Sequence, residues 1–331
     1  MNLWQNKNVL ITGCSGIIGS WLTRRLVDEG ANVVGIVRDR LGYGNLLQEQ
    51  TINRMVVAHG DITDFLFMSR VMAEYEIDTV FHLAAQTIVT IANRSPLSTF
   101  ESNLRGTWIV LEACRLSPTV ERVVVASSDK AYGDSKELPY REDQPLRGKH
   151  PYDVSKSCTD LLAQSYYHTY RLPVAITRLA NVYGGGDLNF NRIIPGTIKA
   201  VLEGRPPVLR SDGSPLREYL YVEDAVDAYL TLAKNLHRSN VMGEAFNFAP
   251  QQPYQVLEIV QEIIRIAGKE FVPEIRKHMN GEILHQYSDS SKAKERLNWH
   301  TRWDLTKGLS VTIEWYRKFL MDRRPVKYTM E

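Results

Sequence analysis

The sequence has few cysteines, little net charge and no long apolar run, and each absence argues against a class of protein. Its three cysteines show no Cys-x-x-Cys spacing, which argues against a disulfide framework and against a zinc site. A formal net charge of +2 is too small for general attachment to nucleic acid or to an anionic membrane. No apolar run approaches the length of a membrane span, and the polar start leads directly into a strand. We therefore expect a cytoplasmic protein that binds no metal, no nucleic acid and no membrane.

The sequence does contain a regular alternation of strands and helices. Short apolar runs predict strands over residues 9–12, 32–37, 55–58, 79–83, 122–126 and 173–177. Between them, the apolar spacing predicts helices over residues 20–29, 64–75, 97–116 and 152–170. Strands that are apolar on both faces and alternate with helices indicate a parallel sheet covered on both sides. We expect an α/β protein with a Rossmann-type, doubly wound sheet.

The pattern changes after Arg178, which suggests a second lobe. A glycine run at Gly184–Gly186 is followed by prolines and polar loops, as in a loop-rich region that contacts ligand. A helix over 222–236 and a strand over 245–248 are expected to return to the main sheet. We therefore predict a dinucleotide-binding domain over residues 1–178, with a return segment near 222–250. A smaller, interleaved C-terminal α/β lobe over 179–331 would bind substrate.

A glycine-rich turn joins the first strand to the first helix. Gly13, Gly16 and Gly19 allow a tight turn and a close approach to a pyrophosphate, and the helix N-terminus supplies N–H donors. The alternative is a turn with a purely structural role. In its strand–turn–helix context the pattern favours dinucleotide binding, and the residues expected to contact the cofactor here are Gly13, Ser15, Gly16, Ile17, Ile18 and Gly19.

The choice between NAD and NADP depends on the end of the second strand. Asp39 would accept hydrogen bonds from the adenosine ribose of NAD, whereas Arg38 would favour the 2′-phosphate of NADP. We expect NAD. NADP stays possible because an arginine and an aspartate are both present at this position. Asp61 and Ile62, after the third strand, are placed to meet the adenine ring. The alternative is a helix N-cap at Asp61 or Asp64.

Tyr152 and Lys156 are four residues apart and therefore share one face of a helix. We expect the cation to lower the pKa of the phenol, so that a tyrosinate can take a proton from a substrate hydroxyl. Hydride would leave the same carbon for nicotinamide. Ser128, which ends a strand upstream, can hydrogen-bond the same substrate oxygen.

The chain resembles the extended short-chain dehydrogenase/reductases of the nucleotide-sugar epimerase/dehydratase group. The motifs that carry this resemblance are the turn 12–19, residues 81–86, Asn103 with 106–107, residues 127–133, Tyr152 with Lys156, and residues 178–184, 217–224 and 289–299. The resemblance implies that further cofactor contacts come from Leu83, Ala84, Ala85, Gln86, Asn103, Tyr152 and Lys156. It implies that a sugar nucleotide is held by Gln86, Ser128, Asn181, Asn191, Arg192, Arg217 and Tyr219. It also implies a homodimer formed by the helices that begin near 97 and 152.

Within this group, the segment Ser128-Asp129-Lys130 distinguishes two reactions. Epimerases resemble the chain up to the serine and then carry small residues, whereas sugar 4,6-dehydratases commonly have Thr-Asp-Glu. Asp129 fits the role of the general acid that protonates the leaving C6 oxygen, provided that burial raises the pKa of its carboxyl group. Lys130 stands where the glutamate base is usual and must be neutral to take the C5 proton. The alternative is a local ion pair between Asp129 and Lys130.

The resemblance therefore implies an NDP-hexose 4,6-dehydratase that forms an NDP-4-keto-6-deoxyhexose. The triplet is similar to that of CDP-glucose 4,6-dehydratases, while Gly35–Arg38 is more similar to GDP-mannose 4,6-dehydratase, so the nucleotide stays open. One alternative is an NAD-dependent UDP-sugar 4-epimerase, which shares every motif except Asp129-Lys130. A more remote alternative is a non-catalytic dinucleotide-binding protein.

Overall fold

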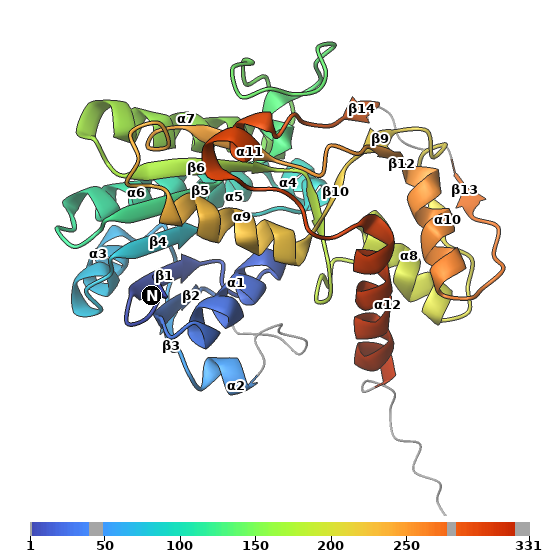
Figure 1. The fold of residues 1–331 in the computed structure, drawn as a ribbon, viewed down its shortest axis with the longest axis horizontal. Coiled ribbons are helices and arrows are strands. Elements are labelled where there is room, and N and C mark those ends of the chain that lie inside the picture. The colour runs from blue at the N-terminus through green and yellow to red at the C-terminus, as the bar shows by residue number, and fades with distance from the viewer. Residues whose placement is uncertain (1, 40–48, 277–282, 322–331) are drawn as a thin grey trace, which may run out of the picture.

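A seven-stranded parallel sheet forms the centre of the protein in a computed structural model, which describes residues 2–39, 49–276 and 283–321 (Figure 1). The strand order is β11-β6-β5-β4-β1-β2-β3. All six pairings are parallel. The strands are β1 (Asn8–Thr12), β2 (Asn32–Val37), β3 (Val56–His59), β4 (Thr79–His82), β5 (Arg122–Ala126), β6 (Val174–Leu179) and β11 (Ala245–Phe248). The predicted doubly wound fold is confirmed.

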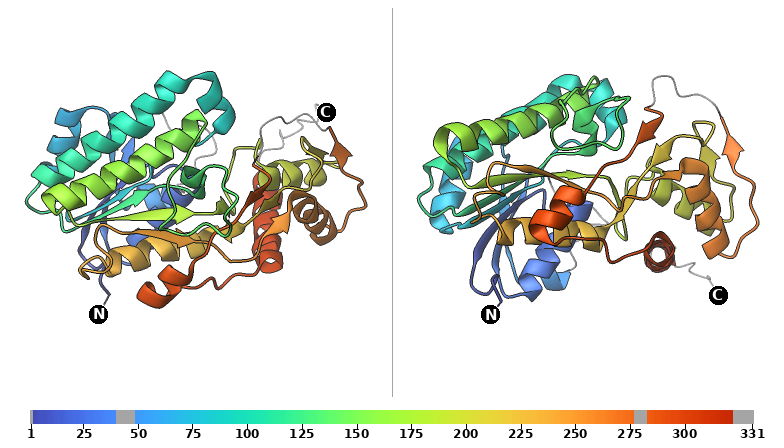
Figure 2. Two further views of the ribbon diagram at one scale, coloured as in Figure 1. Left: turned by 90° about the horizontal axis from the view of Figure 1, so that it is seen from above. Right: turned by 45° about the horizontal axis from the view of Figure 1, so that its top comes forward.

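Helices cover both faces of this sheet (Figure 2). Val9 and Ile11 of β1 pack on one face with α1 (Ile17–Asp28) and α9 (Val222–Lys234). Leu10, between them, points to the other face and packs with α3 (Phe65–Glu74), α6 (Gly106–Leu116) and α7 (Pro151–Tyr170). This alternation explains why the strands are apolar throughout, since both of their faces are buried.

The order of the strands reverses beside β1, which lies between β2 and β4. In open parallel sheets, ligands bind outside the carboxyl ends of the strands at such a switch point. The glycine turn that follows β1 and the loop that follows β4 both begin at this edge. The topology therefore places these two loops together at the expected ligand site.

The second lobe lies beside the carboxyl edge of the main sheet (Figure 1). Its helices are α8 (Ile193–Leu202), α10 (Val256–Ile266) and α12 (Leu305–Met321), and they share one apolar core. Three small sheets complete it, with strands β7 (Asn181–Tyr183), β8 (Val208–Leu209), β9 (Leu216–Arg217), β10 (Tyr219–Tyr221), β12 (Tyr254–Gln255), β13 (Glu274–Ile275) and β14 (His285–Gln286). The chain returns to the first core through α9, β11 and α11 (Ser291–Leu297).

Two helices differ from their predicted bounds in a way that matters for the site. The predicted helix over 20–29 begins earlier, at Ile17, with Gly16 as its N-cap. The predicted helix over 97–116 is divided into α5 (Pro96–Phe100), a π-helical turn (Glu101–Arg105) and α6. A short helix α4 (Val89–Arg94) precedes them, and α2 (Glu49–Ile52) precedes β3. The earlier start of α1 brings its N-terminus into the glycine turn.

None of the helices in the described ranges is long and apolar enough to cross a membrane. Within the same ranges, no group of three or more His, Cys, Asp or Glu side chains is arranged to hold a metal ion.

Candidate active site

A cleft of about 1560 Å³ is lined by residues of both the main sheet and the second lobe. Its floor includes the glycine turn and the carboxyl ends of β2, β4 and β5, and the opposite wall comes from the loops around β7 and α8. The predicted site residues that line it are Gly13, Ser15, Gly16, Ile17, Ile18, Gly19, Arg38, Asp39, Asp61, Ile62, Leu83, Ala84, Ala85, Gln86, Ser128, Asp129, Lys130, Tyr152, Lys156, Asn181, Asn191, Arg192, Arg217 and Tyr219.

The glycine turn fits the pyrophosphate of a dinucleotide. Gly13 has a φ of +74°, and a Cβ there would lie 2.8 Å from the backbone nitrogen of Ala84. A Cβ on Gly19 would collide with the Gly13 carbonyl, whereas a Cβ on Gly16 would meet nothing closer than 3.4 Å. Two of the glycines are thus required by the protein's own packing, and Gly16 is not. No side chain caps the N-terminus of α1 at Gly16, so its first N–H groups can bind an anion.

The acidic and basic residues after β2 and β3 contact one another. Arg38 donates from Nε and Nη2 to Asp39 Oδ2 at 3.0 and 2.9 Å, and its Nε lies 4.0 Å from Asp61 Oδ2. Asp61 accepts hydrogen bonds from Thr63, while the N-cap of α3 is Asp64. The alternative role as helix cap therefore belongs to Asp64, and Asp61 stays available at the cleft.

Tyr152 and Lys156 lie in the first turns of α7, which begins with Pro151 after the N-cap His150. Burial lowers the pKa of Lys156 to about 8, and its Nζ donates to the Ala126 carbonyl at 2.7 Å. Burial raises the pKa of Tyr152 to about 12, and the main effects that oppose this are the Arg192 charge and a side-chain hydrogen bond with Ser128. Lys156 is not among the main groups that act on the Tyr152 phenol here, since its ammonium donates to the end of β5, and its predicted effect on the phenol stays a prediction.

The Ser128-Asp129-Lys130 segment forms a 3-10 turn over Asp129–Tyr132 with Ser128 as its N-cap. Ser128 Oγ donates to Asp129 Oδ1 at 3.0 Å and accepts from the Lys130 backbone N–H at 3.2 Å. Asp129 is only 4% exposed, and burial raises its pKa, as predicted. A carboxyl group at this position can therefore carry a proton more readily than an ordinary aspartate.

Lys130 reaches from this turn to the second lobe. Its Nζ donates to the Oε1 atom of Gln286 at 2.6 Å, and Gln286 is fully buried. Burial raises the pKa values of Asp129 and Asp153, and the Lys130 charge partly opposes both shifts, so this side chain lies near both carboxyl groups. The Lys130 side chain therefore lies near the side-chain amide of Gln286 and the carboxyl groups of Asp129 and Asp153.

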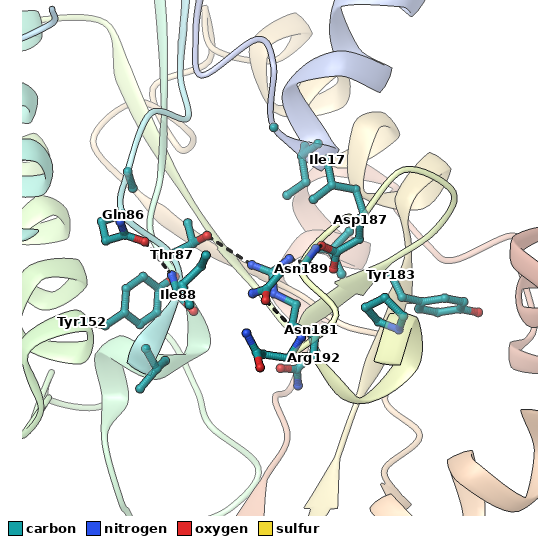
Figure 3. A pocket seen from close by; sticks show the side chains of 18 of the residues that line it. Ile17, Gln86, Thr87, Ile88, Tyr152, Asn181, Tyr183, Asp187, Asn189 and Arg192 are labelled. Atoms are coloured by element: carbon teal, nitrogen blue, oxygen red, sulfur yellow. Dashed lines mark hydrogen bonds and ion pairs between the residues drawn. The ribbon is translucent and has the colours of Figure 1, made fainter. Parts of the chain in front are cut away.

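The predicted substrate residues are hydrogen-bonded to other parts of the protein. Arg192 donates to Asp187 Oδ2 at 2.9 Å and to Thr87 Oγ1 at 3.2 Å, which links α8 to the loop after β4 (Figure 3). Arg217 donates to three backbone carbonyls, those of Leu216, Ile283 and Leu284. Asn191 Oδ1 accepts from Arg210 at 3.0 Å, and Asn181 donates to the Glu218 carbonyl at 3.1 Å.

Three cleft residues, Thr87, Asp187 and Arg210, were not predicted from the sequence. Asp187 directly follows the glycine run, and that position is a signal that could have identified it. Thr87 likewise follows the predicted Gln86. Arg210 stands in a polar loop with no spacing pattern, and only the fold brings it to Asn191.

Asn103, a predicted cofactor contact, lies behind the lining residues of the cleft. It is 1% exposed and lies in the π-helical turn. Its amide accepts from Gln86 N at 2.7 Å and donates to Gln86 O at 3.1 Å and to Ser155 Oγ at 2.9 Å. Asn103 thus fixes the backbone of the loop that carries Gln86 and ties it to α7.

The geometry can be compared with that of known proteins. A family model described as GDP-mannose 4,6-dehydratase matches residues 10–312. The CDP-glucose 4,6-dehydratase of Salmonella typhimurium is 31% identical, over 96% of this chain and 93% of that protein. These matches extend over almost the whole chain and include both sides of the cleft.

Solved structures show the same arrangement of main sheet and lobe. The UDP-glucose 4-epimerase of Thermotoga maritima, solved with UDP-glucose, has a TM-score of 0.86 at 27% identity and covers 95% of this chain and 99% of its own. The dTDP-glucose 4,6-dehydratase of Bacillus anthracis, solved with NAD, has a TM-score of 0.82 at 26% identity, with 94% and 97% covered. The resemblance inferred from the motifs is thus confirmed, and the chain belongs to the GDP-mannose 4,6-dehydratase family.

Proposed function

We propose that this protein is an NDP-hexose 4,6-dehydratase of the CDP-glucose or GDP-mannose type, which forms an NDP-4-keto-6-deoxyhexose. The observation that carries the proposal is Asp129, a buried carboxyl with a raised pKa beside Ser128 and in the same cleft as Tyr152. A 4-epimerase has no use for such an acid, since it only oxidises and reduces C4. A dehydratase needs it to protonate the oxygen that leaves C6.

The residues present fit NAD. The N-terminus of α1 would hold the pyrophosphate, and Asp39 and Asp61 would face the adenosine. Because both carboxylates already neutralise Arg38, a 2′-phosphate gains little there, which favours NAD over NADP. The NAD in the Bacillus anthracis relative supports this choice. When bound, NAD would supply the hydride acceptor for the oxidation at C4 and the hydride donor for the reduction at C6.

The chain's own residues would move the protons. Tyr152 takes the proton of the C4 hydroxyl, with Ser128 beside it. Asp129 gives a proton to the C6 oxygen, which leaves as water, because its raised pKa allows it to carry one. In its neutral form, Lys130 would take the C5 proton, since a neutral amine keeps an N–H for the side-chain oxygen of Gln286 and a lone pair for the incoming proton.

The sugar nucleotide would lie between the two sides of the cleft. We place its diphosphate at Arg192 and Arg217, and the rest of the sugar nucleotide at Gln86, Ser128, Asn181, Asn191 and Tyr219. The dinucleotide then occupies the part built by residues 1–178 with the return segment, and the sugar nucleotide the part built by the remainder of 179–331. Binding of the diphosphate would compete with Asp187 and Thr87 for the Arg192 guanidinium.

We also propose a homodimer. Leu97, Trp108 and Leu161 are 74%, 43% and 55% exposed on α5, α6 and α7. These helices pack against one another on one side of the main sheet (Figure 2). Large apolar side chains gathered on neighbouring helices support a contact with a second copy of the chain.

A UDP-sugar 4-epimerase is the second candidate, because the Thermotoga maritima structure has a similar fold. The two candidates differ in their products. We would incubate the purified protein and NAD with CDP-glucose, GDP-mannose, dTDP-glucose and UDP-glucose, and measure the absorbance of a 4-keto sugar in alkali. The proposal expects this chromophore with at least one substrate. Formation of an epimer without the chromophore would overturn it.

A further inference from the structure

We propose that His82 is a positioning residue for the cofactor site: as a neutral imidazole protonated on Nε2, it links the loop proposed to contact NAD to the helix that carries Tyr152. His82 is the last residue of β4, is 2% exposed and lies behind the lining residues of the cleft. This inference rests on the cofactor site of the proposed function. It does not depend on which sugar nucleotide is converted.

The Nδ1 atom of His82 must accept a hydrogen bond. It lies 2.8 Å from Thr12 Oγ1, at the end of β1. The Thr12 hydroxyl accepts from the backbone N–H groups of Leu83 at 3.1 Å and of Ala84 at 3.2 Å. These two bonds occupy both of its lone pairs, so its own proton is directed at His82 Nδ1. Nδ1 is therefore the unprotonated nitrogen of the ring.

The Nε2 atom of His82 must donate a hydrogen bond. It lies 3.0 Å from Thr107 Oγ1, on α6. The Thr107 hydroxyl gives its proton to the backbone carbonyl of Asn103 at 2.5 Å, so it can only accept from the ring. The ring therefore carries its proton on Nε2. The bonds at the two nitrogens involve different parts of the chain, and both require the same tautomer.

Asn103 extends this chain of hydrogen bonds to α7. Its carbonyl accepts from Thr159 Oγ1 at 3.2 Å, and its side-chain amide donates to Ser155 Oγ at 2.9 Å. Ser155 Oγ in turn donates to the Tyr152 carbonyl at 2.7 Å. These three partners all belong to α7. The chain that begins at the end of β1 therefore ends in the backbone at Tyr152.

The loop over residues 83–86 is anchored at both of its ends by this chain. Thr12 holds two backbone N–H groups at the start of the loop, and Asn103 holds the N–H and the carbonyl of its last residue. His82 joins the two anchors through Thr107. Because this loop lines the cleft, loss of the link would let the proposed cofactor contacts move relative to α7.

The surroundings of the ring keep it neutral. Burial lowers the pKa of His82 to about 3, and the charge of Lys156, on α7, acts in the same direction. The hydrogen-bond partners from β1 and α6 are the neutral hydroxyls of Thr12 and Thr107. A protonated ring would direct a second N–H at the Thr12 hydroxyl, whose lone pairs are already occupied, and would break the link.

The tautomer can be observed in the wild-type protein without any turnover. The chain has eight histidines, and the ring whose signals are lost in His82→Gln, or change in Thr107→Val, would be followed by nitrogen nuclear magnetic resonance. We expect a proton on Nε2 and none on Nδ1, with shifts that stay constant between about pH 5 and 8. A ring protonated on Nδ1, or one that titrates with the ordinary histidine pKa of about 6.5, would overturn the proposal.

Two substitutions of Thr107 test the effect of the link on the cofactor site. Thr107→Val removes the acceptor for Nε2, whereas Thr107→Ser keeps the hydroxyl. NAD binding is measured by tryptophan fluorescence at a temperature at which each protein is folded. We expect Thr107→Val to weaken NAD binding about tenfold, the weight of one buried hydrogen bond, and Thr107→Ser to stay within about threefold of wild type.

A merely structural role of the network predicts a different result. Thr107→Val would then lower the temperature of unfolding and leave the NAD affinity of the folded protein unchanged, which would overturn the proposal. Equal weakening by Thr107→Ser would overturn it too, because the hydroxyl would not be the group that matters. A wild-type protein that binds no NAD would instead overturn the proposed cofactor site, before any variant is compared.

Discussion

The two sides of the cleft hold their polar side chains in different ways. On the sheet side, Lys156 is buried and bonded to a backbone carbonyl, and Asp160 forms two bonds to Arg178 beneath the site. On the lobe side, Arg192 and Asn191 are bonded to other side chains at the cleft surface. Bonds to buried backbone are fixed when the sheet forms, whereas bonds between cleft side chains can be exchanged for bonds to a ligand. The comparison indicates that Lys156 and Asp160 are preformed on the cofactor side, whereas Arg192 and Asn191 are adaptable on the substrate side.

The sharpest test of this comparison breaks one ion pair on each side. The Asp160 and Arg178 side chains are 0% and 3% exposed, so Asp160→Asn leaves a buried guanidinium charge and should lower the free energy of unfolding by about 3–5 kcal/mol. The matched variant Asp187→Asn breaks the pair with Arg192, in which Asp187 is 6% and Arg192 is 36% exposed; because the guanidinium left without its partner reaches solvent, the loss should be smaller, about 1–2 kcal/mol. Urea unfolding measures both. Equal losses would contradict the distinction.

The two sides should also differ in how pH affects stability. Burial raises the pKa of Glu218, on the lobe side, from 4.5 to about 7. Between these pH values the folded protein keeps the Glu218 proton and the unfolded chain has lost it, so the free energy of unfolding falls as pH rises from 4.5 to about 7. The pKa of Lys156, on the sheet side, falls from 10.5 to about 8, so the unfolded state binds the extra proton and stability rises with pH above about 8. Each change amounts to at most roughly 3.5 kcal/mol.

Two variants assign these changes to their residues. Glu218→Gln should flatten the curve of unfolding free energy between pH 4.5 and 7, and Lys156→Met should flatten the rise between pH 8 and 10. Denaturant unfolding at a series of pH values measures both. If either variant leaves its window unchanged, the burial of that group does not control the stability there.

The glycine turn allows stability and cofactor binding to be separated. Gly13→Ala introduces a Cβ at a positive φ against the Ala84 backbone and should cost about 1–3 kcal/mol in stability. Gly16→Ala has room for its Cβ and should change stability by about 0.5 kcal/mol or less. It should nevertheless weaken NAD binding about tenfold or more, because the pyrophosphate must approach this backbone. Thermal unfolding and NAD titration are the measurements, and unchanged NAD affinity in Gly16→Ala would place the pyrophosphate elsewhere.

The smallest expected effect on folding concerns the exposed apolar side chains. Leu161→Glu, on α7, should convert the proposed dimer to a monomer in light scattering and leave the unfolding of each chain nearly unchanged. Val272→Glu is the matched control, since Val272 is 86% exposed in the second lobe. A wild-type protein that is already monomeric, or a dimer that survives Leu161→Glu, would contradict the proposed interface.

The same contrast explains what the sequence could predict. The glycine turn and the Tyr152–Lys156 spacing depend on neighbouring residues, so their strand–turn–helix and helix-face positions followed from local pattern. The direction of the Lys156 ammonium depends on Ala126 in β5, a partner that the local pattern around Tyr152 does not encode.

Long-range contacts limited the other predictions too. Asn103 was recognised as part of a motif, but its π-helical turn and its bonds to Gln86 became visible only in the fold. The bond from Lys130 to Gln286 joins residues that lie 156 positions apart. No local pattern encodes such a pairing, because it depends on how β14 is placed beside the first core.

The fate of the sugar hydrogens shows most directly whether this protein is a dehydratase. The protein would be incubated in deuterated water with NAD and each of the four NDP-hexoses, and the product would be examined by mass spectrometry and nuclear magnetic resonance. A dehydratase that uses Tyr152, Asp129 and Lys130 as proposed yields a product that has lost one water, carries solvent deuterium at C5 and has received the C4 hydrogen at C6. A product of unchanged composition, inverted at C4 and free of deuterium, would contradict the account.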